Sequence, residues 1–324
     1  MHDNQRDYDN NGVSKHTVGN IIRYSIIVLL LISLIICIVL LVSIYRKNKK
    51  EEEAYIVQGE VCIQQVQDSE ELIAELDALP TPAPTAEPTP APSLAPGQKP
   101  EPTVEPDTSQ TKTPTKQLLE KKNEDIVGWI KINGTNINYP VVQTDNNSYY
   151  LDHNFKKQSS AAGAIFMYAE NTFKDENISI YGHHMNNSKY SIMFSELVNY
   201  YDKDYAKSHS KIYFSDDYNN LQEYTVLLAM HIDKEKVKMN YLRQSFPSEA
   251  IFKAYMDQLK NNANMFLETT DYAYGDRFIT LITCDRSQYG KNGRCIVVAV
   301  RKPTSEEVEQ DTMEKPEYGL DYSS

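Results

Sequence analysis

Hydrophobic and polar positions along the chain fall into three patterns. Residues 25–45 (SIIVLLLISLIICIVLLVSIY) form an uncharged apolar run of 21 residues, which is long enough to cross a bilayer as one helix. Residues 80–116 hold eleven of the fifteen prolines among Thr, Ala, Glu and Ser, a composition typical of an extended spacer. In residues 117–303, short runs of β-branched and aromatic residues alternate with turns, which predicts a globular domain rich in strands.

Eight segments of this domain have the composition of strands. They are residues 126–132, 136–142, 164–168, 178–182, 211–214, 223–230, 277–284 and 295–301. Eight short strands separated by turn signals favour a barrel or a sandwich over a doubly wound sheet. The domain is therefore predicted to be mainly β.

Helical spacing predicts three helices in the same domain, at residues 116–124, around 193–201, and at 248–266. The third has the clearest pattern, with Ser248 as its capping residue. Its apolar stripe consists of Ile251, Phe252, Tyr255, Met256, Leu259 and Met265. Such a stripe is most simply explained by a helix that packs on the strands.

The segments outside the domain have simpler patterns. We expect residues 25–45 to be an uncleaved transmembrane helix, because no small-residue cleavage site follows the run. Residues 46–116 are predicted to be a juxtamembrane segment and a Pro-rich stalk. Within that segment, Leu72, Ile73, Leu76 and Leu79 have helical spacing, which predicts a short amphipathic helix over 68–79. Residues 304–324 carry seven acids and one lysine, so we expect an acidic, disordered tail.

Composition excludes several classes of function. The 324-residue chain has a net charge of −12 and no basic stripe, which argues against nucleic-acid binding. Its four cysteines, Cys37, Cys62, Cys284 and Cys295, form no CxxC pair and have no neighbouring histidine cluster. This spacing fits neither a disulfide framework nor a metal site. We therefore predict no metal and no cofactor.

Candidate chemistry lies at the ends of three predicted strands. Tyr181-Gly-His-His184 ends one strand, Thr280-Leu-Ile-Thr-Cys284 ends another, and Arg294 precedes a third. Nine residues separate Cys284 from Arg294, so an antiparallel return would bring the two together. A nucleophilic thiol, an imidazole proton carrier and a cation for a developing oxyanion are what thiol-based acyl transfer requires.

The order His, Cys, Arg, with Thr-Leu-x-Thr-Cys before the nucleophile, resembles the sortases. Residues 117–303 resemble a class B sortase through these segments and three more, Val127-Gly-Trp-Ile-Lys-Ile132, Tyr139-Pro-Val-Val-Gln143 and Ala164-Ile-Phe-Met167. The resemblance implies an eight-stranded β-barrel with an N-terminal helix and a long helix before the cysteine strand. It also implies a membrane-anchored cysteine transpeptidase of Gram-positive bacteria, with residues 1–24 cytoplasmic and the catalytic domain extracellular.

The same resemblance assigns roles to individual residues. Cys284 is the expected nucleophile, His183 the general acid and base, and Arg294 the residue that stabilises the oxyanion and the substrate. The residues that match the family's substrate groove are Asn147, Leu151, Tyr181 and Asp285. One departure is Ile282, where many relatives have a smaller residue and where extra bulk is expected to narrow the groove.

The implied reaction is cleavage of a C-terminal sorting signal after Thr, through a thioacyl-enzyme, and transfer of the surface protein to a cell-wall amine. The signal itself, of the Leu-Pro-x-Thr-Gly or the Asn-Pro-x-Thr type, stays open. One alternative is a membrane-anchored cysteine peptidase, which usually places its cysteine before its histidine. The other alternative is a stalked, non-catalytic surface-binding protein.

Overall fold

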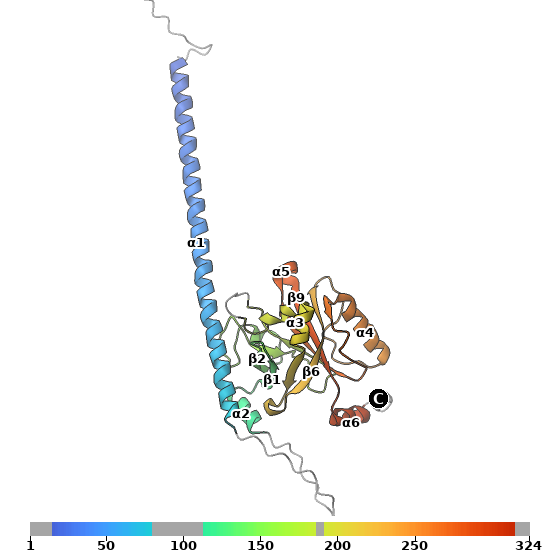
Figure 1. The fold of residues 1–324 in the computed structure, drawn as a ribbon. Coiled ribbons are helices and arrows are strands. Elements are labelled where there is room, and N and C mark those ends of the chain that lie inside the picture. The colour runs from blue at the N-terminus through green and yellow to red at the C-terminus, as the bar shows by residue number, and fades with distance from the viewer. Residues whose placement is uncertain (1–14, 80–112, 186–190, 315–324) are drawn as a thin grey trace, which may run out of the picture. The chain divides into compact units, whose positions relative to one another are not determined.

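The computed structural model describes residues 15–79, 113–185 and 191–314 (Figure 1). The contacts divide the chain into two units, residues 1–57 and 58–324, and the boundary falls within helix α1 (Lys15–Asp77). The predicted N-terminal segment up to residue 14, the Pro-rich residues 80–112 and the end of the tail lie outside the described residues.

The first unit contains the apolar run. Residues Asn20–Lys47 of α1 are 28 residues that contain an 18-residue stretch with a mean hydropathy of 3.5, and they include the predicted span at 25–45. Within the described part of the chain, this is one helix long and apolar enough to cross a membrane.

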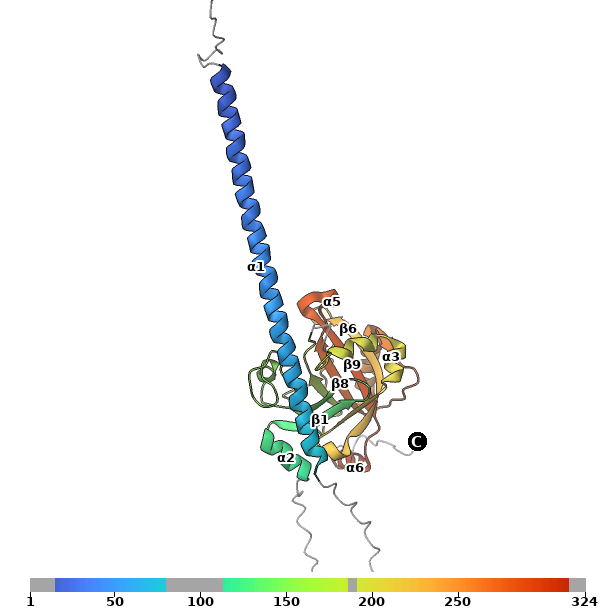
Figure 2. The ribbon, with the colours of Figure 1, turned by 60° about the vertical axis from the view of Figure 1, so that its left-hand side comes forward.

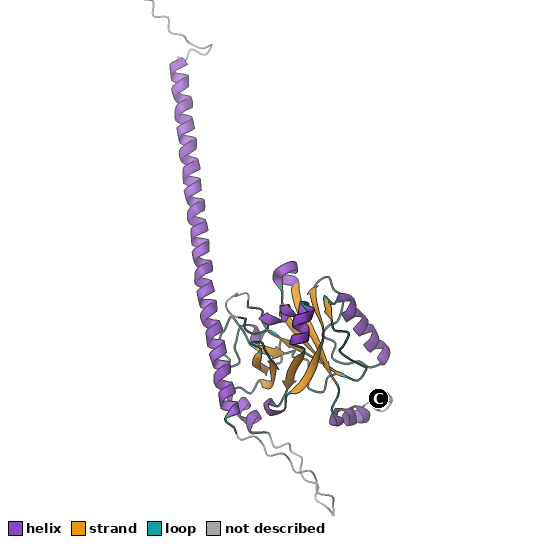
Figure 3. Ribbon diagram, viewed as in Figure 1, coloured by secondary structure: helices purple, strands orange, loops and turns teal. Residues whose placement is uncertain are grey.

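The second unit is built on a closed barrel (Figures 2 and 3). Its strands are β1 (Ile126–Ile132), β2 (Asn138–Val142), β3 (Ile165–Met167), β4 (Asn177–Tyr181), β5 (Lys211–Ser215), β6 (Gln222–Asp233), β7 (Met265–Phe266), β8 (Arg277–Cys284) and β9 (Gly293–Arg301). They pair in the order β5-β1-β2-β3-β4-β8-β9-β6, and β6 pairs back to β5. The pairs β2–β3 and β4–β8 are parallel. The predicted eight-stranded barrel is confirmed, and the two-residue β7 adds to the edge of β6.

Helices cover the barrel, so the chain as a whole is mixed α/β. Its helices after α1 are α2 (Pro114–Lys122), α3 (Lys203–Ser208), α4 (Glu249–Asn262), α5 (Arg286–Tyr289) and α6 (Ser305–Glu314), with 3-10 turns at Tyr149–Leu151, Ser195–Tyr201, Tyr218–Asn220 and Gly290–Asn292. Ser248 caps α4 as predicted, since its hydroxyl accepts from the Ile251 N–H. The predicted stripe was too long. Ile251 is exposed, and Met265 lies in β7 after the helix has ended.

Two hydrophobic clusters occupy opposite faces of β8. Ile279 and Leu281 belong to the cluster that contains residues of β1 and β3, whereas Phe278 and Ile282 belong to the cluster that contains the apolar face of α4. This alternation follows from the two-residue period of a strand. Cys284 continues the row of Phe278 and Ile282, and it is the half-buried last residue of the strand.

A third cluster joins the end of α1 to the barrel. Leu72 and Leu76 pack with Trp129, Tyr150 and their neighbours. Ion pairs flank the contact, with Lys156 Nζ 2.9 Å from Asp68 Oδ1 and Lys122 Nζ 2.6 Å from Glu75 Oε1. The predicted short helix is thus the final part of α1.

The Pro-rich segment is flanked on both sides by elements that contact the barrel. The Tyr218 hydroxyl donates to Asp77 Oδ1 at 2.9 Å, at the last residue of α1. At the other end of the segment, Thr115 and Leu119 of α2 are buried in the same unit. Elements on both sides of residues 80–112 therefore belong to the unit that contains the barrel.

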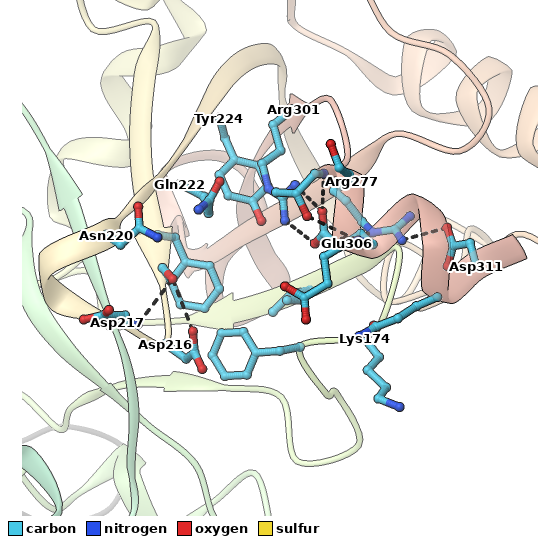
Figure 4. Close-up of a pocket in the computed structure, with 18 of the residues that line it drawn as sticks. Lys174, Asp216, Asp217, Asn220, Gln222, Tyr224, Arg277, Arg301, Glu306 and Asp311 are labelled. Carbon is cyan, nitrogen blue, oxygen red and sulfur yellow. Dashed lines mark hydrogen bonds and ion pairs between the residues drawn. The ribbon is translucent and has the colours of Figure 1, made fainter. Parts of the chain in front are cut away.

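The tail begins with a helix, contrary to the predicted disorder from residue 304. The Thr304 N–H donates to the Glu307 carboxylate at 2.7 Å, and the Glu307 N–H donates to Thr304 Oγ1 at 3.3 Å, which forms a capping box. Two arginines of the barrel hold the helix. Arg301 donates two hydrogen bonds to Glu307, and Arg277 Nη2 lies 2.7 Å from Asp311 Oδ2. These groups line a cleft of about 990 Å³ at the start of β8 and the end of β9 (Figure 4).

Candidate active site

Cys284 and Arg294 are direct cross-strand partners. Cys284 is the last residue of β8, Arg294 is the second residue of β9, and their Cα atoms pair in the antiparallel register. Both side chains are half-buried, and Cys284 is a free thiol. The Arg294 guanidinium is oriented by its own turn, because Nη1 donates to the Gly293 carbonyl at 2.8 Å and to the Lys291 carbonyl at 3.1 Å. The sequence prediction that a hairpin unites these two residues is correct.

The two histidines reach the same end of the barrel through β4. Tyr181 pairs with Ile282 of β8, and the Gly182 N–H donates to the Ile282 carbonyl at 3.1 Å. His183 comes two residues after Tyr181, and Cys284 comes two residues after Ile282. Because β4 and β8 are parallel, both residues lie at the same edge of the barrel. His184 Nδ1 lies 2.9 Å from the Cys284 carbonyl oxygen. A carbonyl can only accept, so His184 donates from Nδ1 and ties the end of β4 to the residue that carries the thiol.

His183 has a defined tautomer when neutral. Its Nε2 lies 2.7 Å from the Leu151 carbonyl oxygen, so Nε2 carries the hydrogen and Nδ1 is the nitrogen that can gain or lose a proton. The ring fits against Gly163, which has a φ of +60°. A Cβ at Gly163 would lie 2.9 Å from the His183 ring and 2.5 Å from the Tyr150 carbonyl oxygen, so glycine permits this close approach.

The predicted substrate residues have different environments. The Leu151 side chain is 44% exposed beside His183, which suits contact with a ligand. Tyr181 is half-buried and stacks on Phe166 with 5.4 Å between ring centroids. Asn147 uses its side-chain oxygen within the fold, where it accepts from the Ala169 N–H at 2.8 Å.

Asp285 has a buried environment. Its side chain is buried, and its carboxylate accepts from the Tyr201 hydroxyl and from the Ser287 N–H, each at 3.0 Å. Burial opposes ionisation, but hydrogen bonds from Ser287 and Tyr201 outweigh it and hold the pKa of Asp285 below its ordinary value. The strand period places this residue on the face opposite Cys284. Ile282, predicted to narrow the groove, is likewise buried in the cluster that contains Tyr181 and Tyr241.

Sequence reasoning missed two residues near the pair. Tyr241, in the connection between β6 and α4, lies near Arg294, as does Tyr181. Burial raises the pKa of both phenols, and the positive charge of Arg294 partly offsets the rise. His231 on β6 lies 3.3 Å through Nε2 from the Asp285 carbonyl oxygen. Tyr241 and His231 belong to no sequence motif, so the sequence alone provides no signal for them.

The described residues contain no cluster of three or more His, Cys, Asp or Glu side chains that could hold a metal ion. The groups that the structure does gather at this edge of the barrel are a thiol, two imidazoles and a guanidinium. Their arrangement suits acyl transfer through a thioester, with the guanidinium beside the carbonyl oxygen that becomes negative.

Comparison with known proteins agrees with this geometry. The sortase domain family matches residues 130–302. Sortase B of Listeria monocytogenes is 33% identical over 181 residues, which are 55% of this chain and 70% of that protein. Sortase B of Staphylococcus aureus is 33% identical over 188 residues, which are 57% of this chain and 74% of that protein.

Solved structures give the same result. The Staphylococcus aureus sortase B-substrate complex has a TM-score of 0.52 and 31% identity, and the match covers 59% of this chain and 86% of that one. The structure of sortase B complexed with triglycine has a TM-score of 0.52 and 30% identity, covering 59% of this chain and 87% of that one. The eight-stranded mixed barrel is shared with these structures. With the family match spanning more than half of its residues, the chain belongs to the sortase family, among the class B cysteine transpeptidases.

Proposed function

We propose that this sortase cleaves a C-terminal sorting signal after its Thr and transfers the protein to a cell-wall amine, with Cys284, His183 and Arg294 as the catalytic residues. The observation that carries the proposal is the cross-strand pairing of Cys284 with Arg294 at the end of the barrel that His183 also reaches. A cation beside a thiol favours the thiolate, which is the nucleophilic form.

The first half of the reaction forms the thioacyl-enzyme. The Cys284 thiolate attacks the carbonyl carbon of Thr, and the Arg294 guanidinium donates hydrogen bonds to the oxygen that becomes negative. His183, as imidazolium, gives the proton on Nδ1 to the departing amine, and the carbon–nitrogen bond breaks. The Leu151 carbonyl supports this choice of nitrogen, because it keeps the hydrogen on Nε2.

The second half transfers the acyl group. An incoming amine attacks the thioester carbonyl, and neutral His183 accepts the proton that the amine gives up. The carbon–sulfur bond breaks and Cys284 leaves as the thiolate, so the thiolate and the His183 imidazolium with which the cycle began are both restored. A sorting-signal peptide and a short glycine chain are the first candidates for the two substrates, since relatives have been solved as a substrate complex and with triglycine.

The proposed location follows from the apolar helix. We propose that Asn20–Lys47 stays as a single membrane anchor, with the segment before it cytoplasmic and the catalytic domain outside. Supporting this are the length of the helix, the missing cleavage site and the location of the sorting signals that the family uses. Leu151 and Tyr181 are the proposed ligand contacts, Leu151 through its exposed side chain.

The test uses the full chain in detergent with a panel of fluorogenic peptides of the Leu-Pro-x-Thr-Gly and Asn-Pro-x-Thr types, with and without triglycine. Cleavage after Thr with amine-dependent product is expected for the parent chain and is lost in Cys284→Ala and His183→Ala. Arg294→Lys keeps the charge but loses the bidentate donor and is expected to be strongly impaired. Cleavage that gives the same product with and without triglycine would favour a peptidase. No cleavage of any peptide, with a Cys284 that does not react with thiol reagents, would favour a binding protein.

A further inference from the structure

A buried histidine and carboxylate pair, His231 and Asp285, lies next to the hairpin that bears Cys284 and Arg294. His231 comes from β6, where its Cα partner is Cys295, the residue after Arg294. Its side chain is only 8% exposed, and Nε2 lies 3.3 Å from the Asp285 carbonyl oxygen and 3.6 Å from Asp285 Oδ2. Both oxygens are acceptors, so His231 is a donor at Nε2.

Tyr201 completes this network from another element. Its hydroxyl donates to Asp285 Oδ2 at 3.0 Å, and its ring stacks on the His231 ring with 5.6 Å between centroids and 17° between planes. Asp285 also accepts from the Ser287 N–H through Oδ1. Each carboxylate oxygen is thereby held, and the backbone carbonyl of the same residue faces His231.

Asp285 is in turn fixed against the start of β9. Its N–H donates to the Gly293 carbonyl at 3.1 Å, and a Cβ on Gly293 would overlap the Asp285 carbonyl oxygen. The two backbones therefore touch. Because Asp285 follows Cys284 and Gly293 precedes Arg294, whatever holds Asp285 also sets the separation of the thiol from the guanidinium.

We propose that His231 and Tyr201 are positioning residues that act through Asp285 to keep the Cys284 thiol beside the Arg294 guanidinium. This inference rests on the proposed function of the same site. His231 is buried behind the hairpin, so its effect on the reaction is indirect. A shift of about 1 Å between reacting groups costs up to about 100-fold in rate, so loss of the donor at 231 is expected to lower kcat far more than it changes KM.

The experiment compares His231→Ala, His231→Gln and Tyr201→Phe in the full chain. The Gln amide can donate to Asp285 in place of Nε2, whereas Ala removes the donor. His209→Ala is the matched control, since His209 also stacks on a tyrosine, Tyr205, with 4.1 Å between centroids and 21° between planes. The measurements are kcat and KM for peptide cleavage, the pH dependence of Cys284 alkylation read by peptide mass spectrometry, and the urea midpoint.

The expected result is a fall in kcat of about 10- to 100-fold for His231→Ala with KM within about twofold, and recovery to within about threefold in His231→Gln. Alkylation of Cys284 is expected to be slower in His231→Ala than in the parent chain across the pH range, because the thiol and the guanidinium lose their fixed separation. Tyr201→Phe, which keeps the ring and loses one donor, should fall between these variants.

Two results would overturn the proposal. One is a His231→Ala variant with the kcat and alkylation profile of the parent chain. The other is a loss of activity in His231→Ala that His231→Gln does not rescue and that is proportional to the fall in the urea midpoint. In that case His209→Ala should show the same relation between activity and midpoint. If the parent chain cleaves none of the peptides, the proposed function fails, and the alkylation profiles still decide the role of His231.

Discussion

Replacement of Leu76 by alanine tests whether the end of α1 is part of the catalytic unit. Leu76 is 2% exposed and Leu72, one turn earlier, is 3% exposed. Both belong to the cluster that contains Trp129, Tyr150 and Phe155. If the contact is stable, losing either leucine side chain leaves a cavity between helix and barrel.

The expected loss follows from burial. Transfer of a leucine side chain from water to the interior stabilises by about 1.5–3 kcal/mol, and the cavity that remains adds to the cost of removing it. We expect Leu76→Ala to lower the free energy of unfolding by about 3 kcal/mol. Leu72 contacts the same cluster, so the double variant should lose less than the sum of the two single variants.

Trp129 provides the assay. It is the one tryptophan of the chain, it is fully buried in this cluster, and its Nε1 donates to Asn138 Oδ1 at 2.8 Å. Urea unfolding of the full chain in detergent, followed by its fluorescence, should show a midpoint lower by about 1 M or more for Leu76→Ala. The exposed Glu70 on the same helix gives the control Glu70→Ala, which should leave the midpoint unchanged. A loss below about 0.5 kcal/mol for Leu76→Ala, within the range of surface changes, would refute the docked helix.

Three further predictions concern other parts of the chain. Replacement of residues 81–111 by a flexible linker of about ten residues should leave kcat unchanged and raise stability by about 1 kcal/mol, because a shorter loop is closed; a loss of fold or activity would show that these residues contribute to the unit. Burial opposes ionisation of Glu307, but hydrogen bonds from Arg301 and Thr304 hold its pKa at about 2, so this group stabilises the fold above about pH 4.5 by on the order of 3 kcal/mol and loses that contribution as pH falls toward 2. Urea midpoints at pH 7, 4 and 3 should therefore converge between the parent chain and Glu307→Gln, and a constant difference would contradict the ion pair. Burial raises the pKa of the Cys295 thiol to about 12, so Cys295→Ala should not change thiol labelling near pH 7 or activity, in contrast to Cys284→Ala.

The strands and the segments that carry His183, Cys284 and Arg294 were predictable because their signals are local. A two-residue alternation of β-branched residues identifies β1 and β8 directly, and the segments around His183 and Cys284 carry enough residues to identify the family. The capping box at Thr304-x-x-Glu307 was equally local, and it could have revealed α6.

Long-range partners could not be predicted from local patterns. Leu72 and Leu76 give an amphipathic stripe, but the stripe does not say that its partner is the Trp129 cluster. The acids of α6 are opposed by one lysine in the tail, whereas the arginines that hold them lie on β8 and β9. The family resemblance placed Asp285 among the groove residues, but it does not give the long-range partners of the buried carboxylate, Tyr201 and His231.

The proposed mechanism requires a covalent intermediate on Cys284, and its identity can be measured. The full chain would be mixed with an intact sorting-signal peptide that it cleaves, in the absence of amine. The reaction would be stopped in acid and analysed by intact and peptide mass spectrometry. We expect an adduct that ends at the peptide's Thr carbonyl and is located on Cys284, and this adduct should be lost when triglycine is added and absent in Cys284→Ala. Cleavage that proceeds with no adduct, or with an adduct on another cysteine, would contradict the proposed mechanism.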